Sequence, residues 1–477
     1  MKKIAKISLV AAVAVAGLTT ANAQPLEQAI KGVEVSGSVV YRYNDYNNDT
    51  NYSGVKTTGT GGAENGVSTK NNGTNSYSDN NYKVGLNVAA PVNDFVKVNT
   101  RFLVANADGD FAGALDTQGG GDSNVDVELS NAYFGFTGIK NTTVNAGKQG
   151  LTTPWTVATQ VDGNEQTGTG LLALSTLGNV TLAGAYFNQT NLNESIDVKL
   201  ANRALKGAFD GASDIATVGT IVAVGPVTLD AWYADMQETF STYTLGAKTS
   251  TTLGGVKLGA DARFTTLELD RELAEGLAYP NLSSDTLDST YNERKDITYT
   301  SNVHDDNSLA KLTLTANVGI FGAKASYGKT GKEGGLTALD NDASTTLLAW
   351  GVTPNGKADA DYYHLQAGVD ILPELNFALN YANVDYTSGD SVTKNANNNV
   401  TGWTEKSVEE EEFYGQLTYK MSKNLVSYVR YGVFTQDSSS HTYKSSVAGS
   451  GENAKHGDSR ADSIDDTRGR IQVAYTF

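Results

Sequence analysis

Segments in which apolar and polar residues alternate recur along most of this chain, and they are separated alternately by short and by long connections. Alternation with a period of two is typical of β-strands that have one apolar and one polar face. In residues 256–265, for example, every second side chain is apolar, and Lys257, Asp261 and Arg263 occupy the opposite face. The pattern therefore predicts a chain made mainly of antiparallel β-strands.

The connections between these segments differ in length in a regular way. Tight turns are expected near residues 91–94, 138–141, 177–179, 225–226, 252–255, 319–321, 371–374 and 421–424. Long polar connections are expected near 44–79, 106–124, 150–170, 189–213, 270–307, 331–361, 387–410 and 437–467, with one much shorter break near 237–239. Eight turns and nine loops join eighteen strands. Sixteen strands is the alternative count, because strand ends are hard to place from a sequence.

This regular difference in length favours a β-barrel that spans a membrane. Such barrels place short turns on the periplasmic side and long loops outside, and only every second residue of a strand must be apolar. After residue 23, no stretch approaches the ~18 consecutive apolar residues of a membrane helix. The expected fold is all-β: a transmembrane, antiparallel, up-and-down β-barrel, closed so that no strand edge faces lipid. A secreted surface-layer or adhesin β-protein is the alternative from composition, since it would share the Gly-, Thr- and Asn-rich, cysteine-free sequence.

Both ends of the chain fit export to an outer membrane. Lys2, Lys3 and Lys6 precede an apolar run at 7–17, and small residues at 21–23 form a cleavage site, as in a secretory signal peptide. We expect residues 1–23 to be the signal peptide and residues 24–477 to form one barrel domain. The last ten residues alternate as a strand and stop on Phe477. That is the pattern of a closing strand that pairs with the first strand.

The composition excludes several classes of function. The formal net charge is −17 at pH 7, and it becomes −20 when the three lysines of residues 1–23 are removed. This acidic balance argues against nucleic acid as a partner. The chain has no cysteine, which excludes a small disulfide-stapled domain. Its four histidines are scattered, and no Ser/His/Asp arrangement is evident, so an enzyme is not expected.

The expected size of the barrel points to a pore. Sixteen to eighteen strands enclose an aqueous lumen, whereas eight strands fill it with side chains. The polar face of the strands is then the pore wall. The charged residues predicted to line it are Arg42, Lys97, Arg101, Asp230, Lys257, Asp261, Arg263 and Arg470. Charged rings set ion preference in channels, and the acidic excess predicts a mild preference for cations.

Several scattered segments resemble the Campylobacter-type major outer membrane porin family. They are residues 24–31, 33–37, 41–43, 146–149, 155–156, 161–163, 167–170 and 472–477. The resemblance implies an eighteen-stranded, homotrimeric, water-filled diffusion channel whose third loop folds into the lumen. On this basis Trp155, Asp162 and Glu165 are expected to narrow the pore.

The resemblance also implies a calcium ion near the constriction, and no organic cofactor. The best-matched carboxylates are Asp162, Asp197 and Asp340, and Ca²⁺ prefers several oxygen ligands of this kind. Outer-membrane lipid and lipopolysaccharide are expected partners. The four glutamates at 409–412 could bridge divalent cations to lipopolysaccharide, or could be a solvated end of a strand.

Two functions remain open from the sequence. The first is a passive porin, through which ions and small hydrophilic solutes diffuse down their gradients. The second is an adhesive or structural surface protein, in which the long loops bind a partner and the barrel is only an anchor.

Overall fold

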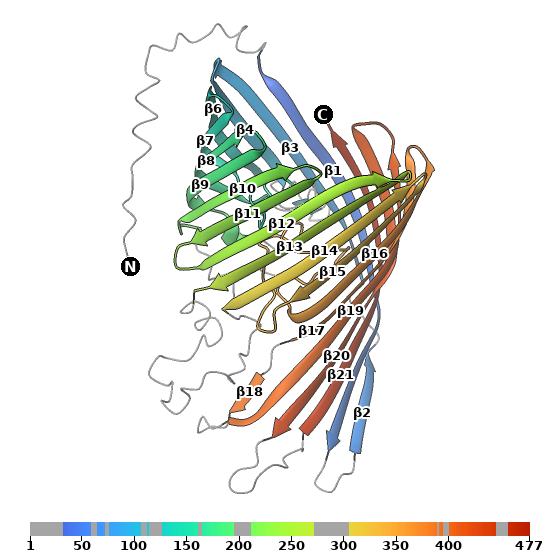
Figure 1. Cartoon of the computed structure of the whole chain (residues 1–477). Coiled ribbons are helices and arrows are strands. Elements are labelled where there is room, and N and C mark those ends of the chain that lie inside the picture. The colour runs from blue at the N-terminus through green and yellow to red at the C-terminus, as the bar shows by residue number, and fades with distance from the viewer. Residues whose placement is uncertain are drawn as a thin grey trace.

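The computed structural model describes residues 32–58, 64–71, 76–105, 112–113, 126–160, 165–194, 211–270, 305–388, 391–394, 400–444 and 457–477. Within these residues eighteen strands close into an antiparallel barrel (Figure 1). They are β1 (Glu34–Thr58), β3 (Tyr77–Asn93), β4 (Val96–Ala105), β6 (Asp126–Ile139), β7 (Thr142–Gly150), β8 (Thr167–Leu177), β9 (Val180–Thr190), β10 (Ile215–Val224), β11 (Val227–Met236), β12 (Phe240–Leu253), β13 (Val256–Leu269), β14 (Asp306–Val318), β15 (Phe321–Thr330), β16 (Ala358–Leu372), β17 (Leu375–Thr387), β19 (Val400–Lys420), β20 (Leu425–Lys444) and β21 (Gly457–Thr476). The predicted eighteen-stranded barrel is confirmed, and the count of sixteen is excluded.

Short elements extend the loops of the barrel. Strand β2 (Glu64–Asn71) pairs with β1, β5 (Ala112–Gly113) pairs with β3, and β18 (Ser391–Lys394) pairs with β19. A 3-10 helix, η2 (Leu192–Glu194), follows β9. No helix among the described residues is long and apolar enough to cross a membrane.

The tight turns all lie at one end of the barrel, and their sequences explain their geometry. They fall at residues 94–95, 140–141, 178–179, 225–226, 254–255, 319–320, 373–374 and 421–424. Gly225 and Gly319 have φ angles of +57°. This left-handed backbone costs glycine nothing and other residues more. Each predicted turn is present, and the short break at 237–239 is a tight connection between β11 and β12 at the opposite end of the barrel.

The first and last strands close the barrel as the sequence predicts. In register, Val39 of β1 lies opposite Tyr475 of β21, and Tyr41 lies opposite Val473. Gly37 and Phe477 exchange backbone hydrogen bonds at 3.0 and 3.1 Å. A Cβ at Gly37 would lie 2.8 Å from the Phe477 ring, so only glycine leaves room for the final aromatic residue.

The two faces of the wall differ as the alternation predicts. Large apolar side chains on the outer face are exposed, for example Val39 (42%), Phe264 (41%) and Val429 (50%). Polar and charged side chains occupy the inner face, where Arg42 is only 7% exposed. The outer face is thus suited to lipid and the inner face to water.

The strands near the seam are much longer than those across from it. Strands β1, β19, β20 and β21 have 25, 21, 20 and 20 residues, whereas β7 has 9 and β10 has 10. Figure 1 shows β1, β20 and β21 running on together beyond the other strands at the end opposite the turns. The barrel wall is therefore taller on the side of the seam.

Candidate functional site

Strands β11 to β13 carry a charged ion pair on the inner face of the wall. Arg263 donates from both Nη atoms to Asp230, at 2.8 Å each. The pair lies against Gly246 of β12, where a Cβ would be 2.5 Å from Arg263 Nη2, so the glycine makes room for it. Asp261 is half-buried, and Lys257 near the turn is exposed. These four charged residues lie on the face that the alternation predicts.

The seam carries two of the other predicted wall residues, Arg42 and Arg470. Arg42 of β1 donates to Gln472 Oε1 at 2.8 Å. Arg470 of β21 donates to Asn44 Oδ1 at 2.7 Å and to Tyr46 Oη at 3.3 Å. Because the acceptors of Arg470 are neutral, these bonds do not cancel its charge.

Lys97 lies at the turn end of the wall. Its side chain is 51% exposed, and its ammonium nitrogen is 3.0 Å from Glu34 Oε1, whose side chain is 71% exposed. An exposed pair of this kind contributes about 0–1 kcal/mol to stability. Lys97 is therefore at the mouth on the turn side and not in the narrow part of the channel.

The connection between β7 and β8 folds into the barrel, as expected for the third loop. We call its described residues, 151–160 and 165–166, the first inward loop. Glu165 is 2% exposed and accepts from Arg101 Nε at 2.7 Å and Nη2 at 2.5 Å. Ser130 donates to the same carboxylate at 3.1 Å, and Lys83 Nζ lies 3.7 Å away. These contacts tie the end of the loop to strands β3, β4 and β6.

The roles of Arg101 and Glu165 therefore differ from those predicted. Arg101 is 3% exposed, and its guanidinium lies where a Cβ at Gly85 would be 2.5 Å from Nη2. The two charges form one buried ion pair with each other, so neither faces the lumen as an unpaired charge. Glu165 ties the first inward loop to the wall, and its carboxylate is buried away from the lumen.

Trp155 also supports the first inward loop from behind. It is 2% exposed and lies in an apolar cluster between the loop and the inner wall. The other buried members are Leu151, Phe187, Leu192, Ile215, Ala234, Met236, Phe240, Leu267, Leu269, Leu336 and Leu339. The family resemblance implies that Trp155 narrows the pore, but the side chain is buried and packs against the wall beneath the loop.

A second long connection, for which the sequence predicts an ordinary polar loop, also packs inside the barrel. We call residues 331–357, between β15 and β16, the second inward loop. Leu339 N donates to Trp155 O at 2.9 Å, and Ser344 Oγ donates to Pro154 O at 3.1 Å. Gln166 Nε2 donates to Leu339 O at 2.5 Å. The two inward loops are therefore joined to each other.

The far part of the second inward loop reaches the wall at β19 to β21. The backbone N–H groups of Trp350 and Gly351 donate to the Glu412 carboxylate, at 2.5 and 3.0 Å. At the end of the loop, Lys357 Nζ lies 2.5 Å from Glu410 Oε2. Burial lowers the pKa of Lys357, and the neighbouring Glu410 opposes this. The loop is thus fixed at its end and at its tip.

Of the three predicted calcium ligands, the structure describes only Asp340. Asp162 and Asp197 lie outside the described residues. Asp340 is 0% exposed, and Gln160 Nε2 lies 2.9 Å from both of its carboxylate oxygens. The Asp342 carboxylate is 3.5 Å from the same nitrogen. Two carboxylates therefore converge beside residue 160, close in sequence to Asp162.

Another group of carboxylates was not predicted. Among the described residues, Asp305, Asp306 and Glu333 have ligand atoms within 4.8 Å of one another. Two of the three are exposed. Exposed acidic groups of this kind are common without a metal, so we assign them no function.

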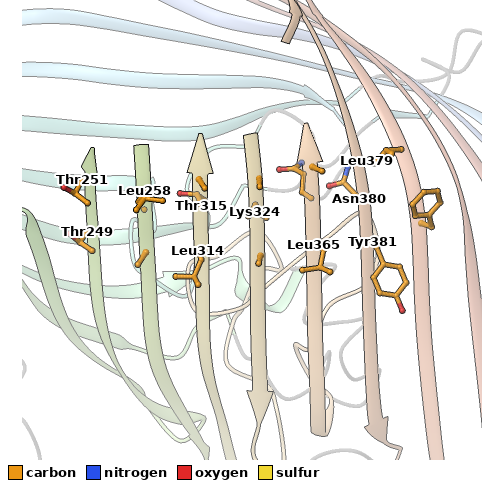
Figure 2. A pocket seen from close by; sticks show the side chains of 18 residues that line it. Thr249, Thr251, Leu258, Leu314, Thr315, Lys324, Leu365, Leu379, Asn380 and Tyr381 are labelled. Atoms are coloured by element: carbon orange, nitrogen blue, oxygen red, sulfur yellow. The ribbon is translucent and has the colours of Figure 1, made fainter. Parts of the chain in front are cut away.

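A groove of about 760 Å³ lies on the lipid-facing side of the wall. Figure 2 shows Leu258, Leu314, Leu365 and Leu379 at this groove, on strands β13, β14, β16 and β17. Alanines lie between these leucines. Because the groove is on the outer face, it is not part of the path through the barrel.

A closed eighteen-stranded barrel with an apolar outside, a charged inside and loops folded into its lumen is the architecture of an outer-membrane channel. A family model described as the Campylobacter major outer membrane protein matches residues 1–455, and the chain belongs to this family. The protein is accordingly a channel protein of the bacterial outer membrane and not an enzyme.

Solved outer-membrane proteins of Pseudomonas aeruginosa have a similar fold. OpdL is similar with a TM-score of 0.57 and 13% identity, over 94% of this chain and 99% of that one. The structure of OpdK with vanillate is similar with a TM-score of 0.54 and 11% identity, over 93% of this chain and 98% of that one. OccK8 (OprE) is similar with a TM-score of 0.54 and 15% identity, over 93% of this chain and 98% of that one. At these identities the likeness shows the fold alone. No curated protein matches the chain.

Proposed function

We propose that this protein is a passive diffusion channel for ions and small hydrophilic solutes. The observation that carries the proposal is the inner face of β13, where charged side chains remain accessible to water inside a closed wall. Lys257 is exposed there, and Asp261 and Arg263 are half-buried. Towards the loops, the two inward loops narrow the path. Size would thus be selected at the loops, and charge by the wall.

Purified, refolded protein is expected to conduct in planar bilayers and to prefer cations mildly. The acidic excess of the chain supports this sign, because negative charge at a channel mouth raises the local cation concentration. Under a KCl gradient the reversal potential should therefore have the sign of a cation-preferring channel. Conductance steps in multiples of three would support the trimer that the family resemblance implies.

Two other results would count against this proposal in different ways. A reversal potential of the opposite sign would contradict the cation preference but leave the channel intact. No conductance from protein shown to be folded by its β-rich circular dichroism would contradict the open channel. It would favour the alternative of an adhesive surface protein for which the barrel is an anchor.

We also propose that Asp340 takes part in a Ca²⁺ site at the junction of the two inward loops. The support is the convergence of the Asp340 and Asp342 carboxylates on Gln160, two residues before Asp162. Carboxylate oxygens are the ligands that Ca²⁺ prefers. Asp162 and Asp197 would supply further oxygens, and bound Ca²⁺ would hold the loops together.

Asp340→Asn is expected to weaken Ca²⁺ binding by roughly tenfold or more, because it removes one charged oxygen ligand. Calorimetric titration of chelator-treated protein with CaCl₂ would measure this. The control is Asp370→Asn, which changes an exposed carboxylate at the turn end of β16 and should bind as the wild type does. Equal affinity of Asp340→Asn and wild type, or no binding to either, would rule out this site.

A further inference from the structure

Two arginines face each other on the inner wall at the seam. Arg430 of β20 lies directly opposite Arg470 of β21. Gln416 of β19 lies beside Arg430, and Asn44 of β1 lies beside Arg470, so one row across four strands holds two guanidiniums between two amides. Like charges directly opposed on a sheet are destabilising. This pair therefore has a cost that the fold itself does not explain.

Among the described residues, no carboxylate forms an ion pair with either arginine of this pair. Arg430 Nε donates to Gln416 Oε1 at 2.8 Å, and Arg470 Nε donates to Asn44 Oδ1 at 2.7 Å. Within the described part of the chain, neither arginine has a carboxylate oxygen within 4.0 Å. Arg101, in contrast, has a bidentate carboxylate partner, Glu165. The row at the seam thus keeps its charge.

Aromatic rings surround the two guanidiniums. The Trp350 ring of the second inward loop has its centroid 5.1 Å from Arg430 Cζ and 5.5 Å from Arg470 Cζ. The rings of Tyr414 and Tyr428 lie 5.0 and 5.2 Å from Arg430 Cζ. Cation–π attraction offsets part of the repulsion. It leaves in-plane N–H donors for other partners, and these are the groups that bind oxyanions bidentately.

Both arginines can be reached from the lumen. Arg430, Arg470 and Trp350 are all half-buried, so each has part of its surface in contact with water. Trp350 lies on the tip of a loop whose neighbouring backbone groups are fixed to Glu412. The indole is therefore held over the arginines by contacts that do not depend on them.

We propose that Arg430 and Arg470, beneath Trp350, form a subsite for small organic carboxylates passing through the channel. The planar guanidinium matches a carboxylate in geometry and charge. The rings of Trp350, Tyr414 and Tyr428 offer an apolar surface for the body of such a solute. The inference rests on the proposed diffusion function and names a solute class for it. An inorganic oxyanion would satisfy the arginines but would not use the rings.

Benzoate is the probe that combines a carboxylate with an aromatic body. We expect calorimetric titration of the full-length protein in detergent to show benzoate binding that is roughly tenfold or more weaker in R430Q/R470Q. R430K/R470K keeps both positive charges on the wall, so a loss of binding in this variant cannot come from the loss of charge. It should also bind benzoate more weakly than the wild type, because lysine lacks the planar fork of arginine. The control is K423Q, which removes an exposed positive charge from the turn between β19 and β20 and should bind benzoate as the wild type does.

Two further probes divide the possible results. Benzyl alcohol, which has the ring but no carboxylate, should bind much more weakly than benzoate. Inorganic phosphate, which lacks the ring, should also bind more weakly. The proposal is overturned if R430Q/R470Q keeps wild-type affinity for benzoate, if either probe matches benzoate, or if the wild type binds none of them.

Conductance separates this inference from the proposed function. In bilayers, benzoate should interrupt the KCl current of the wild type and of K423Q but not that of R430Q/R470Q. KCl current without any benzoate binding would leave the diffusion channel intact and refute the subsite alone. No current from folded protein that still binds benzoate would refute the diffusion channel and leave the binding site.

Discussion

Replacing Glu165 by glutamine is expected to loosen the first inward loop and to raise single-channel conductance roughly 1.5-fold or more, with increased current noise. Glutamine keeps the size of the side chain but removes the charge that Arg101 binds through two nitrogens. Removing one partner of a buried ion pair costs about 3–5 kcal/mol. Because this pair ties the loop to β4, its loss should lower the free energy needed to detach the loop from the wall. Bilayer recordings of single channels would measure the effect.

The matched control for this prediction is Asp230→Asn. It removes the carboxylate of another inner-wall ion pair, that with Arg263, for which the described residues show no hydrogen bond or ion pair to either inward loop. We expect its conductance to change less and its current to stay quiet. If Glu165→Gln conducts like the wild type with the same noise and the same thermal unfolding, Glu165 does not hold the constriction.

Excision of residues 336–355 is expected to enlarge the channel more than any single substitution, raising conductance roughly twofold or more. The ends of this segment already meet, because Gly356 N donates to Gly335 O at 3.0 Å. Gly335 can therefore be joined to Gly356 without strain in the barrel. The excision removes the contacts to the first inward loop and to Glu412, and so clears the lumen of the second inward loop. Bilayer conductance and liposome swelling with sugars of increasing size would both report the change.

Thr353→Ser is the control for the excision. Its hydroxyl keeps the acceptor for Asn355 N and the donor to Leu347 O, so the loop should stay in place and conductance should be that of the wild type. Unchanged conductance and an unchanged size limit after the excision would show that the second inward loop does not narrow the path.

The barrel could be predicted from the sequence because its signals are local. Gly254 and Gly255 mark one turn with φ angles of +57° and +83°, and similar residues mark the others. Strand alternation then assigns each side chain to lipid or lumen, as it did for Arg263 and Asp230. These assignments need only the period of two and the position of the nearest turn.

The packing inside the barrel could not be predicted in the same way. Gln160 bonds to Asp340 across 180 residues of sequence, and Trp350 to Glu412 across 62, and no local pattern encodes such pairs. The sequence does carry one signal of the inward fold. The second inward loop carries Leu336, Leu339 and several other apolar residues, which is unusual for a loop in water. An apolar long loop in a barrel sequence is a sign that it folds inward.

The alternation predicts the face of a wall residue but not its partners. Arg430 was not among them, although the alternation of β20 places it inward beside Arg470. Its position opposite Arg470 depends on the register of β20 and β21, and a shift of one residue would turn the side chain outward. Burial also decides the role of a wall residue, since Arg101 lies on the inner strand face but forms a buried ion pair with Glu165.

The uneven height of the wall divides the barrel into a part whose sequence can vary and a part whose sequence the membrane constrains. Strand β20 has 20 residues, and at ~3.3 Å per residue this is roughly twice the length that the ~25 Å apolar band needs, even with tilt. The seam side of the barrel therefore stands above the lipid as a raised rim. Hydrogen bonds within the bilayer have no replacement from water, whereas those of the rim do. A sequence change along the rim, or a molecule that binds there, should thus leave the membrane-embedded wall and the narrow part of the channel beneath it unchanged.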